Sequence, residues 1–385
     1  MKKKLAKLIS LIFFPLYILI LLTKPFLNIK FGNLYSSRIG HLCELHQFII
    51  LKNNFYKKEI WFISFSKPII NLQLYNIIKK QKNYIEIPSI IGKYFEIFLN
   101  IINDKTINLD LSGKNYFENF NRYLNIKDFL QPVKKNIEFN KLLNDYLHLN
   151  RVICIHNRDN SLQKSQNLKL EYHSFRNSNP KYLNKMINNL VSNNFFVVRM
   201  GSSSDEKLQF KSKYFFDYTR SKENNNLNDL ILLSNCRYYI GSDSGLSNVP
   251  RIFGKESFYI NFPINHVDKL TFFHSGIFLP KKIFEKKTQK LLSLREIFDR
   301  KLYKINLNDL FLKEGVYFYE NSDEEIYNFS MNLINLNKND ILITYEQTKF
   351  DELLKNFCNK NNLKTGSFRP KIDADFIKEN NYLLE

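Results

Sequence analysis

The chain has 385 residues, which is too long for one typical core and suits two domains with terminal extensions. With 44% hydrophobic and 15% aromatic residues, its composition belongs to a packed globular protein. The formal net charge of +20 favours an anionic partner. Because the basic residues are scattered and no recognisable nucleic-acid-binding motif accompanies them, a membrane surface or a phosphorylated substrate is favoured over nucleic acid as the partner.

Four cysteines lie far apart, and no C-x-x-C motif is present. They are Cys43, Cys154, Cys236 and Cys358. This pattern predicts a reducing compartment and argues against a zinc site.

The first element along the chain is the apolar segment LISLIFFPLYILILLT, residues 8–23. As a helix it would rise about 24 Å, somewhat less than the roughly 30 Å hydrocarbon layer. Lysines precede the segment, and positive residues also follow it at Lys24, Lys30 and Arg38. Because positive charge resists export of either flank, and Pro15 kinks a helix at mid-run, we predict a re-entrant or surface-lying anchor over residues 1–28. The body would then stay on the cytosolic side of the membrane.

Two other readings of this segment remain open. A cleaved signal peptide is disfavoured, because KPFLNIKFG after the segment lacks the small-x-small cleavage pattern. A single-pass anchor with the body outside the cytoplasm is the second alternative.

From Lys30 onward, short β-rich runs alternate with helical runs, which is typical of an α/β layer structure. In the first half, the predicted strands are 31–36, 59–65 and 84–89. They predict a Rossmann-like domain over residues 29–145, with a polar helical linker near 126–149.

A second α/β half begins with the apolar run of RVICIHNRD, which suits a buried first strand of a parallel sheet. Its predicted strands are 151–155, 195–201, 214–219, 237–240 and 257–262. The β-α-β order predicts a mainly parallel sheet in a domain over 146–335. Near its end, Ser322 and Glu325 form a capping box that begins a helix. The remaining residues, 336–385, are a polar and broken tail that we expect to cross over the other domain as a strap.

In an open α/β sheet, ligands bind outside the carboxyl ends of the strands, so the loops after strands are examined first. The strongest candidate is GSDSG, whose glycines allow close backbone approach and whose amides and hydroxyls can bond phosphate at a helix N-terminus. Its members are Gly241, Ser242, Asp243, Ser244 and Gly245. Asp243 is an anion, so we assign it to sugar hydroxyls or to orienting neighbouring amides. The alternative is a plain turn with Ser244 or Ser247 as a helix N-cap.

Three arginines follow strands in the second half. Arg158 and Arg176 would neutralise a diphosphate, which is the leaving group in sugar transfer and needs its developing charge stabilised. Arg199 beside Gly201 would face the same cleft. The alternatives are surface pairing of Arg158 with Asp159, and an ordinary polar turn after Arg199.

In the first half, Arg38, Gly40 and His41 lie after the first strand, and Glu44 follows one helical turn later. Inverting sugar transfer needs a base that deprotonates the acceptor hydroxyl, and His41 or Glu44 is placed to serve. The alternative is that either residue caps the helix or interacts with its dipole.

Common cofactor motifs are absent: the sequence holds no G-x-G-x-x-G, no G-x-x-x-x-G-K-[ST] and no H-E-x-x-H. A D-x-D pair occurs only at Asp373 and Asp375, away from any predicted strand end. We interpret it as a helix start and therefore predict neither a metal ion nor another cofactor.

Five segments, taken in order, resemble a family of bacterial glycosyltransferases found with surface-polysaccharide genes. They are RIGHL, CIHNRD, YHSFRNSNPKYL, VVRMG and NCRYYIGSDSGLSNVPRIFGK, and SFRPKIDADFIKENNYLL resembles the family's closing segment. The family is similar to the heptosyltransferases of lipopolysaccharide assembly, whose D-[ST]-G loop holds the sugar nucleotide. Glu44 departs from the pattern, because heptosyltransferases place an aspartate base at a different spacing.

The resemblance implies a GT-B fold: two Rossmann-like domains with mainly parallel sheets facing a central cleft, here with an added N-terminal apolar helix. It also implies an inverting, metal-independent mechanism, with Asp243, Ser244 and Gly245 at the donor and Arg38, Gly40 and His41 lining the acceptor side. We therefore expect a glycosyltransferase, hexosyl- or heptosyltransferase-like, that moves a sugar from a nucleotide-sugar donor to a lipid-linked or polysaccharide acceptor. The alternative is a catalytically inactive GT-B-like module that binds nucleotide or glycan.

Overall fold

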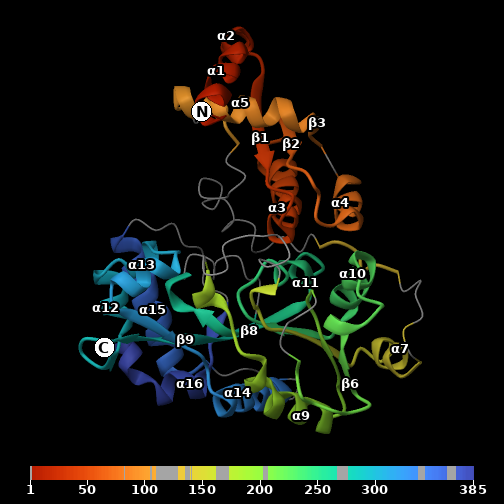
Figure 1. Ribbon diagram of the computed structural model, residues 1–385, viewed down its shortest axis with the longest axis vertical. Coiled ribbons are helices and arrows are strands. Elements are labelled where there is room, and N and C mark those ends of the chain that lie inside the picture. Colours follow the sequence, from red (N-terminus) through yellow and green to blue (C-terminus); the bar gives the residue numbers. More distant parts are fainter. Residues whose placement is uncertain are drawn as a thin grey trace. The chain divides into compact units, whose positions relative to one another are not determined.

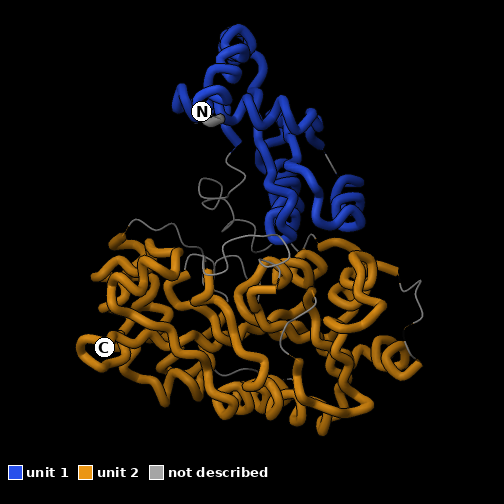
Figure 2. Tube along the Cα trace, viewed as in Figure 1, with its two compact units in different colours: residues 1–128 blue, residues 129–385 orange. Residues whose placement is uncertain are grey.

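The structure is a computed structural model, and it describes residues 2–81, 83–104, 106–109, 129–134, 139, 141–161, 173–202, 207–266, 276–336, 343–361 and 370–385. The chain separates into two compact units, Met1–Asp128 and Phe129–Glu385, which we call unit 1 and unit 2 (Figure 2).

Unit 1 begins with an apolar helix that is interrupted before Pro15. Its three pieces are α1 (Lys2–Ser10), η1 (Leu11–Phe13) and α2 (Phe14–Thr23). The 3-10 turn η1 directly precedes α2, where Pro15 occupies one of the first two helical positions and lacks an N–H to donate. The predicted apolar N-terminal helix is therefore present. By length and composition alone, Lys4–Thr23 is sufficient to cross a membrane.

The rest of unit 1 consists of a parallel sheet and the helices between and after its strands. Its elements are β1 (Asn28–Leu34), α3 (Ile39–Phe55), β2 (Glu59–Phe65), α4 (Leu72–Lys79), β3 (Ile85–Ile87) and α5 (Ser89–Ile102). Within the described residues the strands form one sheet in the order β1-β2-β3, all parallel. Helix α5 lies so close to β2 at Gly92 that a Cβ atom there would lie 1.8 Å from the hydroxyl of Ser64.

Unit 2 contains a larger sheet. Its strands are β4 (Val152–His156), β5 (Phe196–Arg199), β6 (Phe215–Asp217), β7 (Tyr238–Gly241), β8 (Glu256–Pro263), β9 (Ile277–Glu285), β10 (Lys290–Leu291), β11 (Val316–Tyr319) and β12 (Lys371–Ile372). Within the described residues the main order is β10-β9-β8-β7-β4-β5-β6, and β11 and β12 also pair with β9. The pairs from β6 to β9 are all parallel, so the predicted α/β class with mainly parallel sheets is confirmed (Figure 1).

Helical elements surround this sheet. They are α7 (Lys141–His148), η2 (Ser174–Arg176), η3 (Pro180–Leu183), α9 (Asn184–Ser192), η4 (Tyr218–Arg220), α10 (Asn226–Asn235), α11 (Asn248–Ile252), α12 (Leu294–Asp299), η6 (Leu302–Lys304), α13 (Asn308–Lys313), α14 (Asp323–Leu336), α15 (Tyr345–Lys360), α16 (Ala374–Glu379) and η7 (Asn381–Leu384). The capping box of Ser322 and Glu325 forms as predicted: each residue's amide donates to the other's side chain. Asp373 accepts the amide of Phe376 at 3.0 Å, which confirms the D-x-D pair as a helix start.

Two features of unit 2 differ from the expectation. The division between the units falls at 128/129 rather than at the predicted 145/146, because residues after 128 bond within unit 2: the amide of Leu130 donates to the carbonyl of Ile252. The segment after 336, expected to be broken, contains the 16-residue helix α15 and the strand β12. Its apolar side chains, among them Phe350, Ile372 and Leu383, are buried in the core of unit 2.

Candidate functional site

The candidate site lies where the strand order of unit 2 reverses. From β4 the chain adds β5 and β6 on one side, and then returns to add β7, β8 and β9 on the other. Such a reversal leaves a ligand-binding crevice at the carboxyl ends of the two central strands. There, the amide of Ser242 donates to the carbonyl of His156 at 3.1 Å, and the amide of Arg158 donates to Oγ of Ser242 at 2.7 Å. These bonds hold the loops after β4 and β7 side by side.

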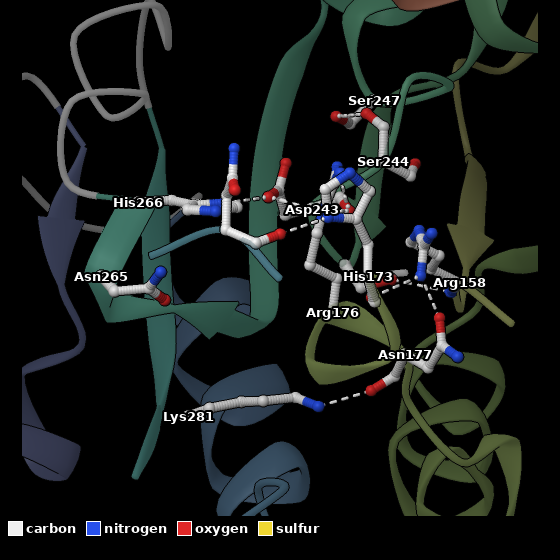
Figure 3. Close-up of polar contacts among 12 residues, drawn as sticks. Arg158, His173, Arg176, Asn177, Asp243, Ser244, Ser247, Asn265, His266 and Lys281 are labelled. Atoms are coloured by element: carbon white, nitrogen blue, oxygen red, sulfur yellow. Dashed lines mark hydrogen bonds and ion pairs between the residues drawn. The ribbon is translucent and has the colours of Figure 1, made fainter. Parts of the chain in front are cut away.

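Asp243, in the loop after β7, lies at the centre of a charged cluster (Figure 3). Its Oδ2 atom lies 3.0 Å from Nε of Arg176 and 2.9 Å from Nδ1 of His266. All three side chains are largely buried, and the carboxylate is 8% exposed. A buried carboxylate of this kind needs both charge compensation and hydrogen bonds to remain ionised. The pairing therefore fixes the orientation of Asp243.

Arg176 also binds the backbone of the same loop. Its Nη2 and Nε atoms donate to the carbonyl of Asp243 at 2.9 and 3.2 Å. One guanidinium thus binds both the carboxylate and the carbonyl of a single residue. The several N–H donors of the planar guanidinium allow this geometry, whereas the single ammonium group of a lysine does not. This contact connects η2, which carries Arg176, to the GSDSG loop.

Arg158 holds the other side of the cluster. Its Nη1 atom donates to the carbonyl of His173 at 3.0 Å and to Oδ1 of Asn177. Lys281 of β9 donates to the carbonyl of Asn177 (Figure 3). Three positive side chains, Arg158, Arg176 and Lys281, are therefore organised around one short segment at the sheet edge. Such an arrangement can stabilise an anionic ligand.

Lys281 is unusual because its side chain is almost completely buried, with the residue 3% exposed. Burial lowers the pKa of Lys281 to about 8, although the carboxylate of Glu320 opposes this shift and Arg158 adds to it. The ammonium form is therefore present at neutral pH and is lost in mildly alkaline solution.

The stability of unit 2 is expected to rise with pH between about 8 and 10.5 through Lys281. In this window the unfolded lysine binds a proton that the folded one has lost, so the free energy of unfolding increases, by about 3 kcal/mol in all. Urea unfolding across pH 7–11 should show this rise in the native protein and not in Lys281→Met. Parallel curves for the two proteins would contradict a depressed pKa at Lys281.

Several residues predicted at the donor site make contacts within unit 2. Arg199 is buried, and its guanidinium donates to Oδ1 of Asn157 and Oδ2 of Asp217, both at 3.2 Å. It therefore ties together the ends of β4, β5 and β6. Ser242 is fully buried with its hydroxyl bound to the amide of Arg158. Gly241 leaves room for the side chain of Tyr239, because a Cβ atom at position 241 would lie 2.6 Å from Oη of Tyr239.

Gly201 and the second half of GSDSG remain at the sheet edge. Gly201 has φ of +133°, a conformation that side chains other than glycine rarely adopt. Burial lowers the pKa of the neighbouring His156 to about 4, so its ring is neutral at pH 7. The hydroxyl of Ser247 donates to the carbonyl of Ser244, and the amide of Asn248 donates to the carbonyl of Gly245. Because the following helix α11 has five residues, its dipole is small, and side-chain cations contribute most of the positive charge.

The residues predicted on the acceptor side lie in unit 1, at the start of α3. Arg38 is the N-cap residue, but its side chain does not cap the helix, and Gly40 is buried. Nδ1 of His41 lies 3.1 Å from Oε2 of Glu44, with both side chains about one-third exposed. The two candidate bases therefore pair with each other.

The structure also brings residues into the site that the sequence analysis did not select. His266 and Asn265 follow β8, and Lys281 lies within β9. Asn265 is buried and donates to the carbonyl of Ile305 at 3.1 Å. His266 could have been selected from the sequence, because it follows the predicted strand 257–262, whose carboxyl end lies at the same sheet edge. Among the described residues, no group of histidine, cysteine or acidic side chains has the arrangement of a metal site.

No protein-family model matches the sequence, and no curated protein matches it. Among solved structures, E. coli ADP-heptose lipopolysaccharide heptosyltransferase II has 12% identity and a TM-score of 0.38, over 74% of this chain and 99% of that one. E. coli heptosyltransferase WaaC with ADP has 8% identity and a TM-score of 0.34, over 66% and 91%. The iron-containing dodecameric glycosyltransferase TibC of enterotoxigenic E. coli has 11% identity and a TM-score of 0.32, over 61% and 59%. The chain is thus distantly similar in structure to these glycosyltransferases.

Proposed function

We propose that the protein is a glycosyltransferase that moves a sugar from a nucleotide-sugar donor to a lipid-linked or polysaccharide acceptor at the cytoplasmic face of a bacterial inner membrane. The observation that carries the proposal is the charged cluster at the switch point of the larger sheet. There, two arginines and a buried Asp243–His266 pair gather at the ends of β4, β7 and β8. This is the edge of an α/β sheet where nucleotides bind.

In this proposal, Arg158 and Arg176 face the diphosphate of the donor and stabilise the charge that develops as it leaves. Asp243 orients the loop: its carboxylate is already bound by Arg176 and His266, so it positions amides rather than binding phosphate. The acceptor hydroxyl attacks the anomeric carbon with inversion, His41 or Glu44 takes its proton, and the nucleoside diphosphate departs. The protein's own cations stabilise the leaving group, without a metal ion.

Substituting Arg158 tests the position of the diphosphate. We expect Arg158→Ala to weaken nucleoside diphosphate binding by about tenfold to a hundredfold, the effect of losing a charge-assisted hydrogen bond. A panel of ADP-, UDP-, GDP- and CDP-sugars first identifies the base that the native protein prefers. Titration calorimetry with the four nucleoside diphosphates, ADP, UDP, GDP and CDP, then measures the affinity of the variants. Arg151→Ala is the matched control, because Arg151 precedes β4 at its opposite end and donates to the carbonyl of Asn194.

Equal affinity in the two variants would place the diphosphate elsewhere. If no nucleotide or sugar nucleotide binds the native protein, the glycosyltransferase proposal fails. Binding without transfer to any membrane-derived acceptor would instead favour the inactive binding module.

A further inference from the structure

The apolar N-terminal helix has two different faces, and one of them is part of the core of unit 1. Phe13, Tyr17 and Ile20 contact a buried cluster formed with α5. The ring of Phe13 lies 5.4 Å from that of Phe95, and the ring of Tyr17 lies 5.6 Å from that of Phe98, both edge to face. Figure 1 shows α1 beside α5.

Polar contacts fix the same packing. The hydroxyl of Tyr17 donates to Oδ2 of Asp104 at 2.9 Å, just beyond the end of α5. At the end of α2, Nζ of Lys24 donates to the hydroxyl of Thr106 at 3.3 Å. A helix that left unit 1 to cross a bilayer would lose both bonds. It would also expose the buried side chains of Phe95, Phe98 and Leu99 to water.

The opposite face of the helix is exposed and apolar. Ile12 is 75% exposed and Leu22 is 69% exposed. Other large apolar side chains at helical spacing on this face are also exposed: Leu5, Leu8 and Leu19. A contiguous run of this kind on a soluble surface indicates an interaction site.

The helix and the residues that follow it in the sequence carry charges of one sign. Residues 1–43 contain no aspartate or glutamate but seven positive residues, at Lys2, Lys3, Lys4, Lys7, Lys24, Lys30 and Arg38. Lys4 and Lys7 are exposed on α1, and Lys24 is exposed at the other end of the helix. An apolar face bordered by lysines complements an anionic lipid surface, since the aliphatic side chains enter the headgroup region while the ammonium groups meet lipid phosphates.

We infer that the N-terminal helix is a fixed layer of unit 1 whose outer face lies in the surface of an anionic membrane, while its inner face stays packed on α5. The helix therefore does not cross the bilayer. Membrane binding then requires no unpacking of unit 1, and it does not depend on whether the protein transfers sugar.

Depth measurements on the full chain distinguish a lying helix from a spanning one. Tryptophan is introduced singly on the outer face, as Leu5→Trp, Ile12→Trp and Leu22→Trp. Vesicles of phosphatidylcholine and phosphatidylglycerol carry bromine at a shallow or a deep acyl position, and quenching is recorded. The native Trp61 is the only tryptophan and is buried, so the unsubstituted protein supplies the background.

A lying helix is expected to give equal, shallow quenching at all three positions. A spanning helix would place Ile12 roughly 10 Å deeper than Leu5, given a rise of 1.5 Å per residue, and that depth difference would overturn the inference. No quenching at any position, together with a dimer in sedimentation, would assign the face to a second copy and also overturn it.

Charge reversal tests the choice of lipid. Lys4→Glu, Lys7→Glu and Lys24→Glu together are expected to weaken binding to phosphatidylglycerol vesicles at least tenfold and to leave the weak binding to pure phosphatidylcholine unchanged. The matched control reverses three exposed lysines near the β9–β10 turn of unit 2, Lys286, Lys287 and Lys290. Equal losses in the two triple variants would show a general effect of net charge, and the inferred surface would be wrong.

Discussion

Asp243→Asn is expected to lower the free energy of unfolding by about 3 kcal/mol or more and to weaken donor binding. The carboxylate is buried between Arg176 and His266, and removal of its charge leaves the guanidinium uncompensated in a poorly hydrated site. Because Arg176 also holds the carbonyl of Asp243, its release frees the loop that we propose to face the donor. Urea unfolding gives the stability, and titration with the preferred nucleoside diphosphate gives the binding.

A double substitution separates these two effects. Adding Arg176→Met to Asp243→Asn removes the orphaned charge, so the double variant should regain part of the lost stability. It should not regain donor binding, because the arginine proposed to face the diphosphate is gone. Unchanged stability in Asp243→Asn would show that the carboxylate carries no charge in this pair. Recovered binding in the double variant would exclude Arg176 from the donor site.

Gly276→Ala is expected to prevent unit 2 from folding or to destabilise it by about 4 kcal/mol or more. Gly276 precedes β9 with φ of +119°, and a Cβ atom there would lie 2.0 Å from the carbonyl oxygen of Ser257. That oxygen belongs to the backbone of β8 and cannot move without displacing the strand. Expression yield and thermal unfolding measure the effect.

Gly315→Ala is the control for backbone strain alone. Gly315 also has a positive φ, +69°, but nothing lies within 4 Å of the position that a Cβ atom would take. Its substitution should cost only about 1–2 kcal/mol, the cost of a left-handed conformation. Similar losses in the two variants would show that the contact with Ser257 is relieved by a small shift, and the steric argument would be wrong.

The sequence predicts the layer structure well, because the strands carry strong local patterns. Residues 59–65 were expected as a strand and β2 has these bounds. The pattern of β4 also predicts the sheet edge at which the loops that carry Arg158 and Asp243 are bonded to each other. By contrast, β12 has two residues and pairs with a strand roughly 90 residues earlier, so no periodicity reveals it.

For the candidate site, the sequence could not predict which polar and charged side chains contact one another. Arg199 was predicted to face the cleft, and nothing in the sequence indicated its contacts with Asn157 and Asp217, which depend on three strands that come together only in the fold. The same applies to His266, whose contact with Asp243 joins two loops that sequence reasoning treats separately. Strand ends can be read from local sequence, whereas the pairing of charges across them is decided by tertiary packing.

The pairing of β12 with β9 has a consequence for how the protein is made. Lys371 and Ile372 align with Ile277 and Phe278, and the amide of Asp373 donates to the carbonyl of Phe278. On a ribosome adding about 5–20 residues per second, β9 would emerge roughly 5–20 seconds before its last partner strand. During that interval one edge of β9 has incomplete pairing, which is the state most open to wrong strand addition. Chaperone demand should therefore concentrate late in the synthesis of unit 2, and chains that end before residue 371 should aggregate instead of accumulating as a soluble fragment.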